Sequence, residues 1–296
     1  MDTLILNRLG KTEPVRLHLD HIFRTIKQSE TTTLDEHDLS RFKIKVSRLD
    51  LDTEGSFFKP LPRSQLPQIN WDEVNFSDWA AGETNEARRV DYTFLRVSSH
   101  IWNATFQNSD QEWIPRKYYH EDTNIGGSVE LRPLEWQTTG EVEEKWRRKP
   151  HCSYRIFHYA EPSDALRRGE VLSLLRYMRW RMQQGSFLQH YTFPVLICSI
   201  SRSKVRLLEA YHDGESLCIS KSEFYDFKEN VVENYQLFMQ WIFGVPCGDT
   251  CAPLQITGVE FAPATKKRIL SNLARKARLA DARRKHLERH MIVSAT

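Results

Sequence analysis

Residues 204–220 have the sequence KVRLLEAYHDGESLCIS. An Asp-Gly pair separates two runs of alternating apolar residues, and this pattern is typical of a tight turn between two antiparallel strands. Alternate residues of a strand share a face, so Glu209 is predicted to lie in an otherwise apolar row. The rest of that row is Val205, Leu207 and Tyr211. A lone carboxylate in such a row must lie at a sheet edge, have a partner or perform a function.

Helix and strand patterns alternate on both sides of this hairpin. Residues 191–200 are almost continuously apolar, as expected for a strand that is covered on both faces. The charged segment 141–149 shows no clear period. The other predicted elements are helices over residues 86–106, between Asp164 and Gly185, and over 230–243, and strands over 41–49, 128–133 and 151–160. This order predicts an α/β or α+β fold with a mixed sheet flanked by helices.

Changes in composition divide the chain into three parts. The first part holds the predicted strand 41–49, and residues 31–38 before it are expected to form a loop or a capped helical turn. It ends in a linker, because three prolines between Pro60 and Pro67 exclude regular structure. The predicted parts are an N-terminal extension (1–67), an α/β core domain (68–255) and a basic C-terminal helix (256–296).

With 296 residues, of which 40% are hydrophobic, the chain can bury a substantial core. It does not begin with a basic stretch followed by a long apolar run, and no eighteen apolar residues occur together. The five cysteines are an odd number at irregular spacing, and Cys198 and Cys218 fall inside predicted strands. We therefore expect a soluble, cytoplasmic protein in a reducing compartment, without a membrane partner.

Several motifs that would define an enzyme class are absent. The sequence has no phosphate-binding loop, no dinucleotide-binding glycine fingerprint, no nucleophile elbow and no His-Glu-x-x-His. Cys247 and Cys251 have the wrong spacing for a zinc knuckle, and no second Cys or His pair follows in register. We therefore expect neither a cofactor nor a metal.

The hairpin and the segment after it carry a group of acids. Gathered carboxylates could hold a guanidinium, bind a divalent metal, or raise the pKa of one member to a value that suits a general base. The alternative is that the turn acids are merely solvated and that Asp226 caps a helix. The candidate catalytic residues are Glu209, Tyr211 and His212, and the candidate substrate-binding residues are Asp213, Glu215 and Asp226.

Weaker candidates flank the other predicted strands. A set of histidine, tyrosine and carboxylate side chains could move a proton near neutral pH, but a histidine at a strand end is more often a satisfied structural residue. No motif supports the serines as nucleophiles. These candidates are His151, His158, Tyr154, Tyr159, Ser153, Ser199 and Ser201.

Most of the positive charge lies near the C-terminus. Residues 264–290 contain ten Lys and Arg against two acids, a net charge of +8, so the rest of the chain carries −5. The segment is rich in Ala and Leu, lacks Gly and Pro, and should be helical. Such a helix suits a phosphate backbone, although it could also pack on the acidic body, lie on an anionic membrane or remain solvated. The candidate nucleic-acid contacts are Lys266, Lys267, Arg268, Arg275, Lys276, Arg278, Arg283 and Arg284.

A second basic surface is predicted on the helix between Asp164 and Gly185. Five arginines surround Trp180 there, and a basic surface that bears an aromatic side chain is a further candidate for nucleic-acid contact. The arginines are Arg167, Arg168, Arg176, Arg179 and Arg181.

Short motifs between Arg89 and Thr250 resemble a large group of fungal proteins that is related to the fungal arginine-containing cyclodipeptide synthases. The motifs are DYTFLRV (91–97), HCSYRIF (151–157), FPVLICS (193–199), LEAYHDGESL (208–217), FYDF (224–227) and GDT (248–250). The resemblance implies an enzyme that uses arginyl-tRNA and a second aminoacyl-tRNA to make a cyclic dipeptide in secondary metabolism.

Several features fit this synthase. An aminoacyl ester is already activated, so no nucleotide loop is needed, and carboxylates suit capture of an arginyl group. The same features would serve a non-catalytic nucleic-acid-binding protein. The order of elements also resembles that of PD-(D/E)XK nucleases, but the strand-borne acid followed by acid-x-Lys is missing. Glu143-Glu-Lys145 has these letters in a segment without strand character, so a degenerate nuclease-like enzyme is the third hypothesis.

Overall fold

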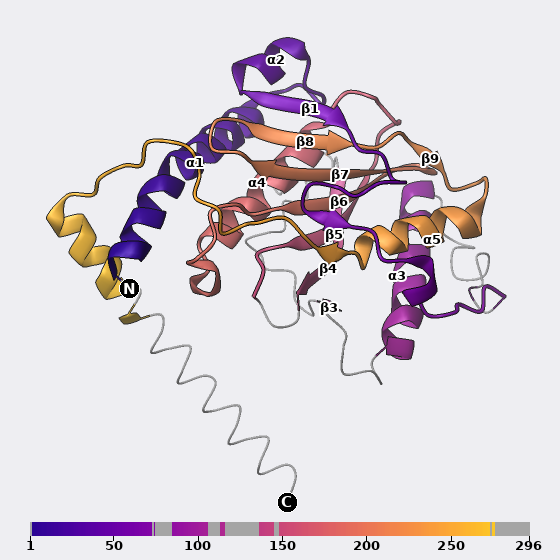
Figure 1. The fold of residues 1–296 in the computed structure, drawn as a ribbon. Helices are drawn as coiled ribbons and strands as arrows, with labels where there is room; N and C mark the ends of the chain where they lie inside the picture. Colours follow the sequence, from indigo (N-terminus) through magenta and orange to yellow (C-terminus); the bar gives the residue numbers. More distant parts are fainter. Residues whose placement is uncertain are drawn as a thin grey trace, which may run out of the picture.

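A mixed β-sheet lies between two pairs of helices (Figure 1). The computed structural model describes residues 2–72, 74, 85–105, 113–115, 136–144, 148–272 and 274–275. The strand order in the sheet is β1-β8-β7-β6-β5-β4-β3, and β9 also pairs with β7. Neighbouring strands are antiparallel except for the parallel pairs β5–β6 and β1–β8. The described part is therefore a mixed α/β structure, as the sequence predicts.

The strands of this sheet are short. They are β1 (Ile44–Arg48), β3 (Trp113–Pro115), β4 (Trp136–Glu144), β5 (Cys152–His158), β6 (Val195–Ser201), β7 (Lys204–His212), β8 (Leu217–Lys221) and β9 (Tyr225–Asp226). A separate antiparallel pair consists of β2 (Phe58–Lys59) and β10 (Val245–Pro246). Two single turns of 3₁₀-helix, η1 (Arg63–Gln65) and η2 (Gly185–Phe187), complete the connections.

Two helices cover each face of the sheet. α1 (Asp2–Gln28) and α4 (Arg168–Met182) bury one hydrophobic core, and α3 (Glu86–Thr105) and α5 (Val231–Ile242) bury the other (Figure 1). The short helix α2 (Glu36–Arg41) precedes β1. Within the described ranges, no helix combines the length and apolar character that a membrane crossing requires.

The β7–β8 hairpin has the predicted form. β7 pairs with β6 on one side and with β8 on the other, so it lies inside the sheet rather than at its edge. Val205 and Leu207 belong to the core under α3 and α5, whereas Leu208 and Ala210 belong to the core under α1 and α4. The alternation along β7 therefore supplies both cores, because successive residues of a strand point to opposite faces.

Most of the predicted elements are confirmed. The structure contains the helices predicted as 86–106, between Asp164 and Gly185, and 230–243, and the strands predicted within 41–49, 151–160 and 191–200. The capped helical turn near residues 31–38 is also confirmed, because Asp35 accepts the N–H of Asp38 at the start of α2. The strand predicted over 128–133 lies outside the described residues.

Three features of the structure do not follow from the sequence patterns. The segment 141–149, which shows no period, begins inside the strand β4, so Glu143 has the strand character that the sequence pattern does not indicate. Val46 in β1 is 36% exposed although the alternation of the strand places it on the same face as the buried Ile44, because β1 is an edge strand. The long helix α1 was not predicted.

Residues of the predicted N-terminal extension contribute to the main sheet and its core. β1 pairs in parallel with β8, and α1 packs along α4. Buried apolar side chains of α1, among them Leu19 and Ile22, belong to the same cluster as Leu174 of α4. This part of the chain therefore completes one face of the fold.

The chain returns to α1 before its basic C-terminal segment. Val259 donates its N–H to the carbonyl of Gly10 (2.8 Å), and Lys11 Nζ donates to the carbonyl of Leu254 (2.8 Å). A Cβ atom at residue 10 would lie 2.6 Å from the Val259 oxygen, so this close approach requires glycine. Residues 263–272 and 274–275 are helical and start beside the first turns of α1 (Figure 1), and the predicted helix beyond residue 275 lies outside the described residues.

A buried ion pair joins α4 to the start of β7. Glu170 accepts hydrogen bonds from Nε (3.0 Å) and Nη2 (2.6 Å) of Arg206. It also accepts a hydrogen bond from the hydroxyl of Ser199 (2.6 Å). Burial alone would raise the pKa of Glu170, but the Arg206 guanidinium lowers this pKa to about 2. The remaining N–H groups of Arg206 bind carbonyls just before α4, so the guanidinium is fully satisfied.

We predict that Glu170→Gln lowers the free energy of unfolding by about 3–5 kcal/mol, because it leaves the buried Arg206 guanidinium without a counter-charge. Urea unfolding measures this loss. Replacing both partners, as Glu170→Met with Arg206→Met, should recover much of it, since no buried charge then remains. The exposed pair of Glu161 and Arg202 is the matched control, and Glu161→Gln should change stability little. An equal loss in Glu161→Gln would contradict the prediction.

Candidate functional site

All three predicted catalytic residues lie at one end of the sheet, where β5 and β6 begin and β7 ends. The register places Cys152 opposite Val195, and Val195 opposite Ala210. Glu209 and Tyr211 flank Ala210 on the α3 and α5 side of the sheet, and His212 follows on the other side. The geometry of this end of the sheet decides what these residues can do.

Glu209 is buried beneath the loop that precedes β2. Its side chain is 1% exposed, and its Oε1 accepts the N–H of Phe57 at 2.8 Å. Backbone amides of Ser56 and Phe58 also stabilise the carboxylate. Oε2 has no hydrogen-bond partner within the described part of the chain. Of the three explanations for a lone acid, an edge position is excluded and a partner is found in the loop.

Burial raises the pKa of Glu209 to about 7, although the amides of Phe57, Ser56 and Phe58 oppose this shift. A carboxyl group with such a pKa exchanges its proton near neutral pH. This is the property that a general acid or base requires, because catalysis is most efficient when the pKa lies near the working pH.

The loop over Glu209 fits closely. A Cβ atom at Gly55 would overlap Oε2 of Glu209, so only glycine allows the loop this approach. The ring of Phe57 packs edge-on against Tyr211, with 4.7 Å between ring centroids. Solvent therefore reaches the carboxyl only when the loop moves.

His212 has both ring nitrogens committed. Gly214 donates its N–H to Nδ1 (3.0 Å), so the ring proton resides on Nε2 and is donated to Nδ1 of His18 (2.9 Å). His18 in turn uses Nε2–H for the carbonyl of Phe42 (3.0 Å). Burial is the largest cause that lowers the pKa of His212 to about 4, and it also lowers the pKa of His18. We interpret the pair as a neutral link between α1 and the hairpin.

The two acids of the turn, Asp213 and Glu215, fit the alternative prediction of a solvated turn. Asp213 Oδ1 accepts the N–H groups of Glu215 (2.8 Å) and Ser216 (2.7 Å), and Oδ2 pairs with Lys45 at 3.0 Å. Glu215 is exposed. Burial alone would raise the pKa of Asp213. The N–H groups of the turn and Lys45 together outweigh this effect and lower the pKa to about 2.

Asp226 lies at the opposite end of β7. It is the register partner of Lys204 and pairs with it at 3.7 Å. Five residues separate Lys204 from Glu209, a distance of about 16 Å along a strand. Asn230, not Asp226, precedes the first turn of α5. The structure therefore does not bring Glu209, Asp213 and Asp226 together in one pocket.

Except for Tyr159, which is 44% exposed, the weaker candidates are buried residues. His158 donates Nε2–H to Ser199 (3.1 Å), which already donates to Glu170, and burial lowers the pKa of His158 to about 4. His151 packs against Phe58, donates Nε2–H to the Cys247 carbonyl (3.0 Å), and has a pKa of about 3 because of burial. Both histidines therefore fit the alternative prediction of a satisfied structural residue.

The predicted basic residues belong to two surfaces, one on the C-terminal segment and one on α4. Lys267, Arg268 and Arg275 are exposed and form no ion pair with any described residue, whereas Lys266 pairs with Glu260 at 3.3 Å. The other four candidates, Lys276, Arg278, Arg283 and Arg284, lie outside the described residues. The prediction of a second basic surface on α4 is wrong, because its arginines point into the protein or are paired. Arg167, Arg168 and Arg181 are buried, and Arg179 pairs with Asp20.

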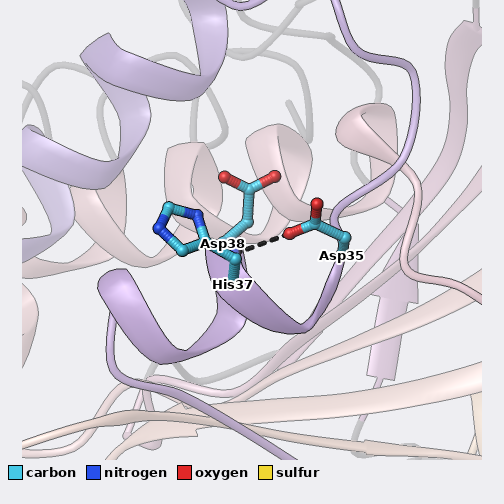
Figure 2. Close-up of side chains that lie close together, drawn as sticks. All are labelled: Asp35, His37 and Asp38. Atoms are coloured by element: carbon cyan, nitrogen blue, oxygen red, sulfur yellow. Dashed lines mark hydrogen bonds between the residues drawn. The ribbon is translucent and has the colours of Figure 1, made fainter.

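One cluster of potential metal ligands occurs among the described residues. Figure 2 shows Asp35, His37 and Asp38 close together at the start of α2. Asp35 Oδ1 accepts the N–H of Asp38 at 2.8 Å and thus caps the helix. The helix cap explains this exposed cluster, and nothing in it requires a metal.

A surface cleft of about 380 Å³ lies between the first turns of α3 and α5. Arg89, Lys228, Phe227 and Tyr235 contribute to its walls. Lys228 pairs with Glu86 at 2.5 Å. None of the predicted catalytic or substrate-binding residues lines this cleft, which is separate from the Glu209 region.

Sequence reasoning missed a second buried ion pair. Arg155 in β5 donates Nε to Asp91 of α3 (2.8 Å), and Thr139 in β4 donates its hydroxyl to the same oxygen (2.6 Å). Gly140 adopts φ +54°, and a Cβ there would overlap the guanidinium. An acid on the apolar face of α3, next to Val90 and Phe94, was the signal that could have indicated this pair.

Comparisons of this chain with protein-family models, with curated proteins and with solved structures found no match.

The raised pKa of Glu209 predicts a dependence of stability on pH. Between the ordinary value of 4.5 and about 7, the folded protein holds a proton that the unfolded chain has lost. The free energy of unfolding should therefore fall as the pH rises through this window, by at most about 3 kcal/mol. Glu209→Gln removes the titrating group and should flatten this dependence in urea unfolding at pH 5 to 8. Parallel curves for the two proteins would contradict the assignment.

The histidine link predicts the opposite dependence at lower pH. Because the pKa of folded His212 is about 4 and its ordinary value is 6.5, the unfolded chain binds a proton first as the pH falls. This contribution to stability is complete above pH 6.5 and is lost as the pH falls through about 4. NMR at pH 6 should show His212 as a neutral Nε2–H tautomer. A His212 ring that titrates near 6.5 would show that the link does not exist.

Proposed function

We propose that this protein binds structured RNA through the cationic segment at its C-terminus, and that the RNA is tRNA. The observation that supports this proposal is the exposure of Lys267, Arg268 and Arg275, which have no acidic partner among the described residues. Each phosphate that a Lys or Arg neutralises releases condensed counterions, so unpaired exposed cations favour binding to a polyanion.

The place where this segment begins is fixed by backbone contacts. Val259 pairs with Gly10, and Lys11 holds the carbonyl of Leu254, so the segment starts at a defined point beside α1. A polyanion bound there would be oriented relative to the body of the protein. This anchoring distinguishes the segment from a freely solvated tail.

We predict that the triple variant Lys267→Gln, Arg268→Gln, Arg275→Gln binds tRNA more weakly and with a smaller salt dependence. Loss of three phosphate contacts should reduce the slope of log K against log salt by roughly 2 to 3. Filter binding or fluorescence anisotropy at several salt concentrations measures this slope.

The matched control carries the same number of changes elsewhere. Arg24→Gln, Lys27→Gln and Arg41→Gln remove three exposed cations from α1 and α2. The control should retain the wild-type slope. If the two triple variants change the slope equally, the C-terminal segment is not the phosphate contact.

A catalytic use of the bound tRNA is the finer proposal, and Glu209 is the observation that favours it. In this proposal the protein joins arginine and a second amino acid from their aminoacyl-tRNAs into a cyclic dipeptide. The amino group of one aminoacyl ester attacks the carbonyl of the other, Glu209 accepts the amine proton, and the tRNA hydroxyl leaves. Attack by the second amino group on the remaining ester closes the ring and releases the second tRNA.

The proposed reaction requires the loop over Glu209 to move, and it leaves Asp213 and Asp226 without a joint role. Glu209 is 1% exposed, so the loop around Gly55 must open before a substrate can reach it. Asp213 is held by Lys45 and Asp226 lies at the other end of β7, so the proposal gives them no joint role in holding the arginyl group.

The two remaining hypotheses differ in their support. A non-catalytic RNA-binding protein is favoured by the enclosure of Glu209, whose carboxylate holds the loop in place. A degenerate nuclease has little support. The acids on the α4 side of β4, Glu141 and Glu143, already bind Tyr177 and Arg181, and β5 carries Ser153-Tyr-Arg155 instead of acid-x-Lys.

Expression in a bacterial host followed by mass spectrometry of the medium separates the first two hypotheses. A synthase should release a small basic product from the wild-type protein and none from Glu209→Gln, while both proteins bind tRNA equally. Product formation by Glu209→Gln would make Glu209 a structural acid. Absence of product from the wild-type protein, with tRNA binding retained, would leave the non-catalytic function.

A further inference from the structure

Arg8 in α1 is a buried arginine without an acidic partner. Its side chain is 3% exposed, and Nε donates to the carbonyl of His190 at 2.6 Å. Both terminal nitrogens, Nη1 and Nη2, are buried and have no hydrogen-bond partner within the described part of the chain. No described carboxylate forms an ion pair with Arg8.

The other deeply buried arginines do not share this property. Arg155 pairs with Asp91, Arg181 with Glu143, and Arg206 with Glu170, each within 3.0 Å. A guanidinium remains charged in proteins, and an unpaired charge in a protein interior is strongly unfavourable. Among the described arginines that are at most 3% exposed, Arg8 alone lacks a carboxylate partner, and a counter-anion from outside the chain would supply one.

Phe193 and the segment that contains His190 lie against the Arg8 guanidinium. One face of the guanidinium lies over the ring of Phe193, with the central carbon 5.4 Å from the ring centroid. The segment that Arg8 contacts is held by a turn, because Tyr191 and Thr192 donate their N–H groups to the carbonyl of Thr250 (2.8 and 3.2 Å). The next residue of this turn, Cys251, is exposed.

The side chains of the turn contact His190. His190 donates Nε2–H to the carbonyl of Arg148 (2.9 Å), so its Nδ1 accepts the hydroxyl of Thr250 (2.7 Å). Cys251 Sγ lies 3.3 Å from the same nitrogen. The Thr250 hydroxyl and the Cys251 thiol therefore lie beside the residue whose carbonyl Arg8 binds, and the hydroxyl proton is already donated to His190 Nδ1.

We propose that Arg8 binds a small oxyanion, a phosphate or a carboxylate, through its two terminal nitrogens. The planar fork of a guanidinium matches two oxygens of either group. Access requires the turn at Thr250 and Cys251 to move, because the two nitrogens are closed to solvent. This site is distinct from Glu209 and from the cations of the C-terminal segment, so it does not depend on the proposed function.

Thermal unfolding in sodium phosphate, sodium acetate and sodium chloride at equal ionic strength tests this proposal. Phosphate or acetate should raise the melting temperature of the wild-type protein by several degrees beyond the effect of chloride, and the more effective salt identifies the oxyanion. Arg8→Met should show no such difference. It should also melt higher than the wild-type protein in chloride, because it removes an unpaired buried charge.

Arg24→Met, which removes an exposed cation from the same helix, is the control and should keep the wild-type response. Equal responses of the wild-type protein and Arg8→Met, or no specific response of the wild-type protein, would overturn the proposal. If Arg8→Met does not fold, Arg8→Lys keeps the charge but lacks the fork. It should need at least tenfold more anion for the same stabilisation, and an unchanged response would overturn the proposal as well.

Discussion

The position of β7 between β6 and β8 determines how the two helical layers and the loop before β2 are held. Because β7 is paired on both sides, its alternating residues must face the two helical layers, and each polar residue in it needs a partner from another element. Arg206 finds Glu170 on the α4 side, and Glu209 finds backbone amides on the other side. One strand therefore fixes α4 against the sheet and holds the loop before β2 in place.

Buried charges are compensated in this fold in two different ways. Ion pairs such as that of Arg206 and Glu170 hold their carboxylates ionised, so they tie elements together and cannot exchange protons near neutral pH. Glu209 has only loop amides as partners, and burial therefore outweighs them and raises its pKa to about 7. The same environment that makes Glu209 costly to ionise makes it suitable for proton transfer. A structural role and a catalytic role thus depend on the same property, and they differ in whether the loop opens.

The elements that follow simple periodicity could be predicted from the sequence. The Asp-Gly turn and the alternation around it indicate the hairpin, and helical spacing indicates α3 and α5. β4 could not be predicted because its buried acids, Glu141 and Glu143, find their partners on α4, far along the chain. α1 contains Pro14, which local rules treat as a helix breaker. The position of Glu209 in an apolar row could also be predicted, but its partners could not, since backbone amides 152 residues away leave no signature in the sequence.

The central claim is that Glu209 holds a proton near neutral pH while it is enclosed by its loop. The most direct measurement is a ¹³C NMR titration of the carboxyl groups of the folded protein, with the Glu209 signal assigned by its absence in Glu209→Gln. We expect a midpoint near 7 for this signal. A midpoint near the ordinary value of 4.5 would contradict it, because enclosure would then not raise the pKa of this carboxyl into the range in which it readily accepts and returns a proton at neutral pH.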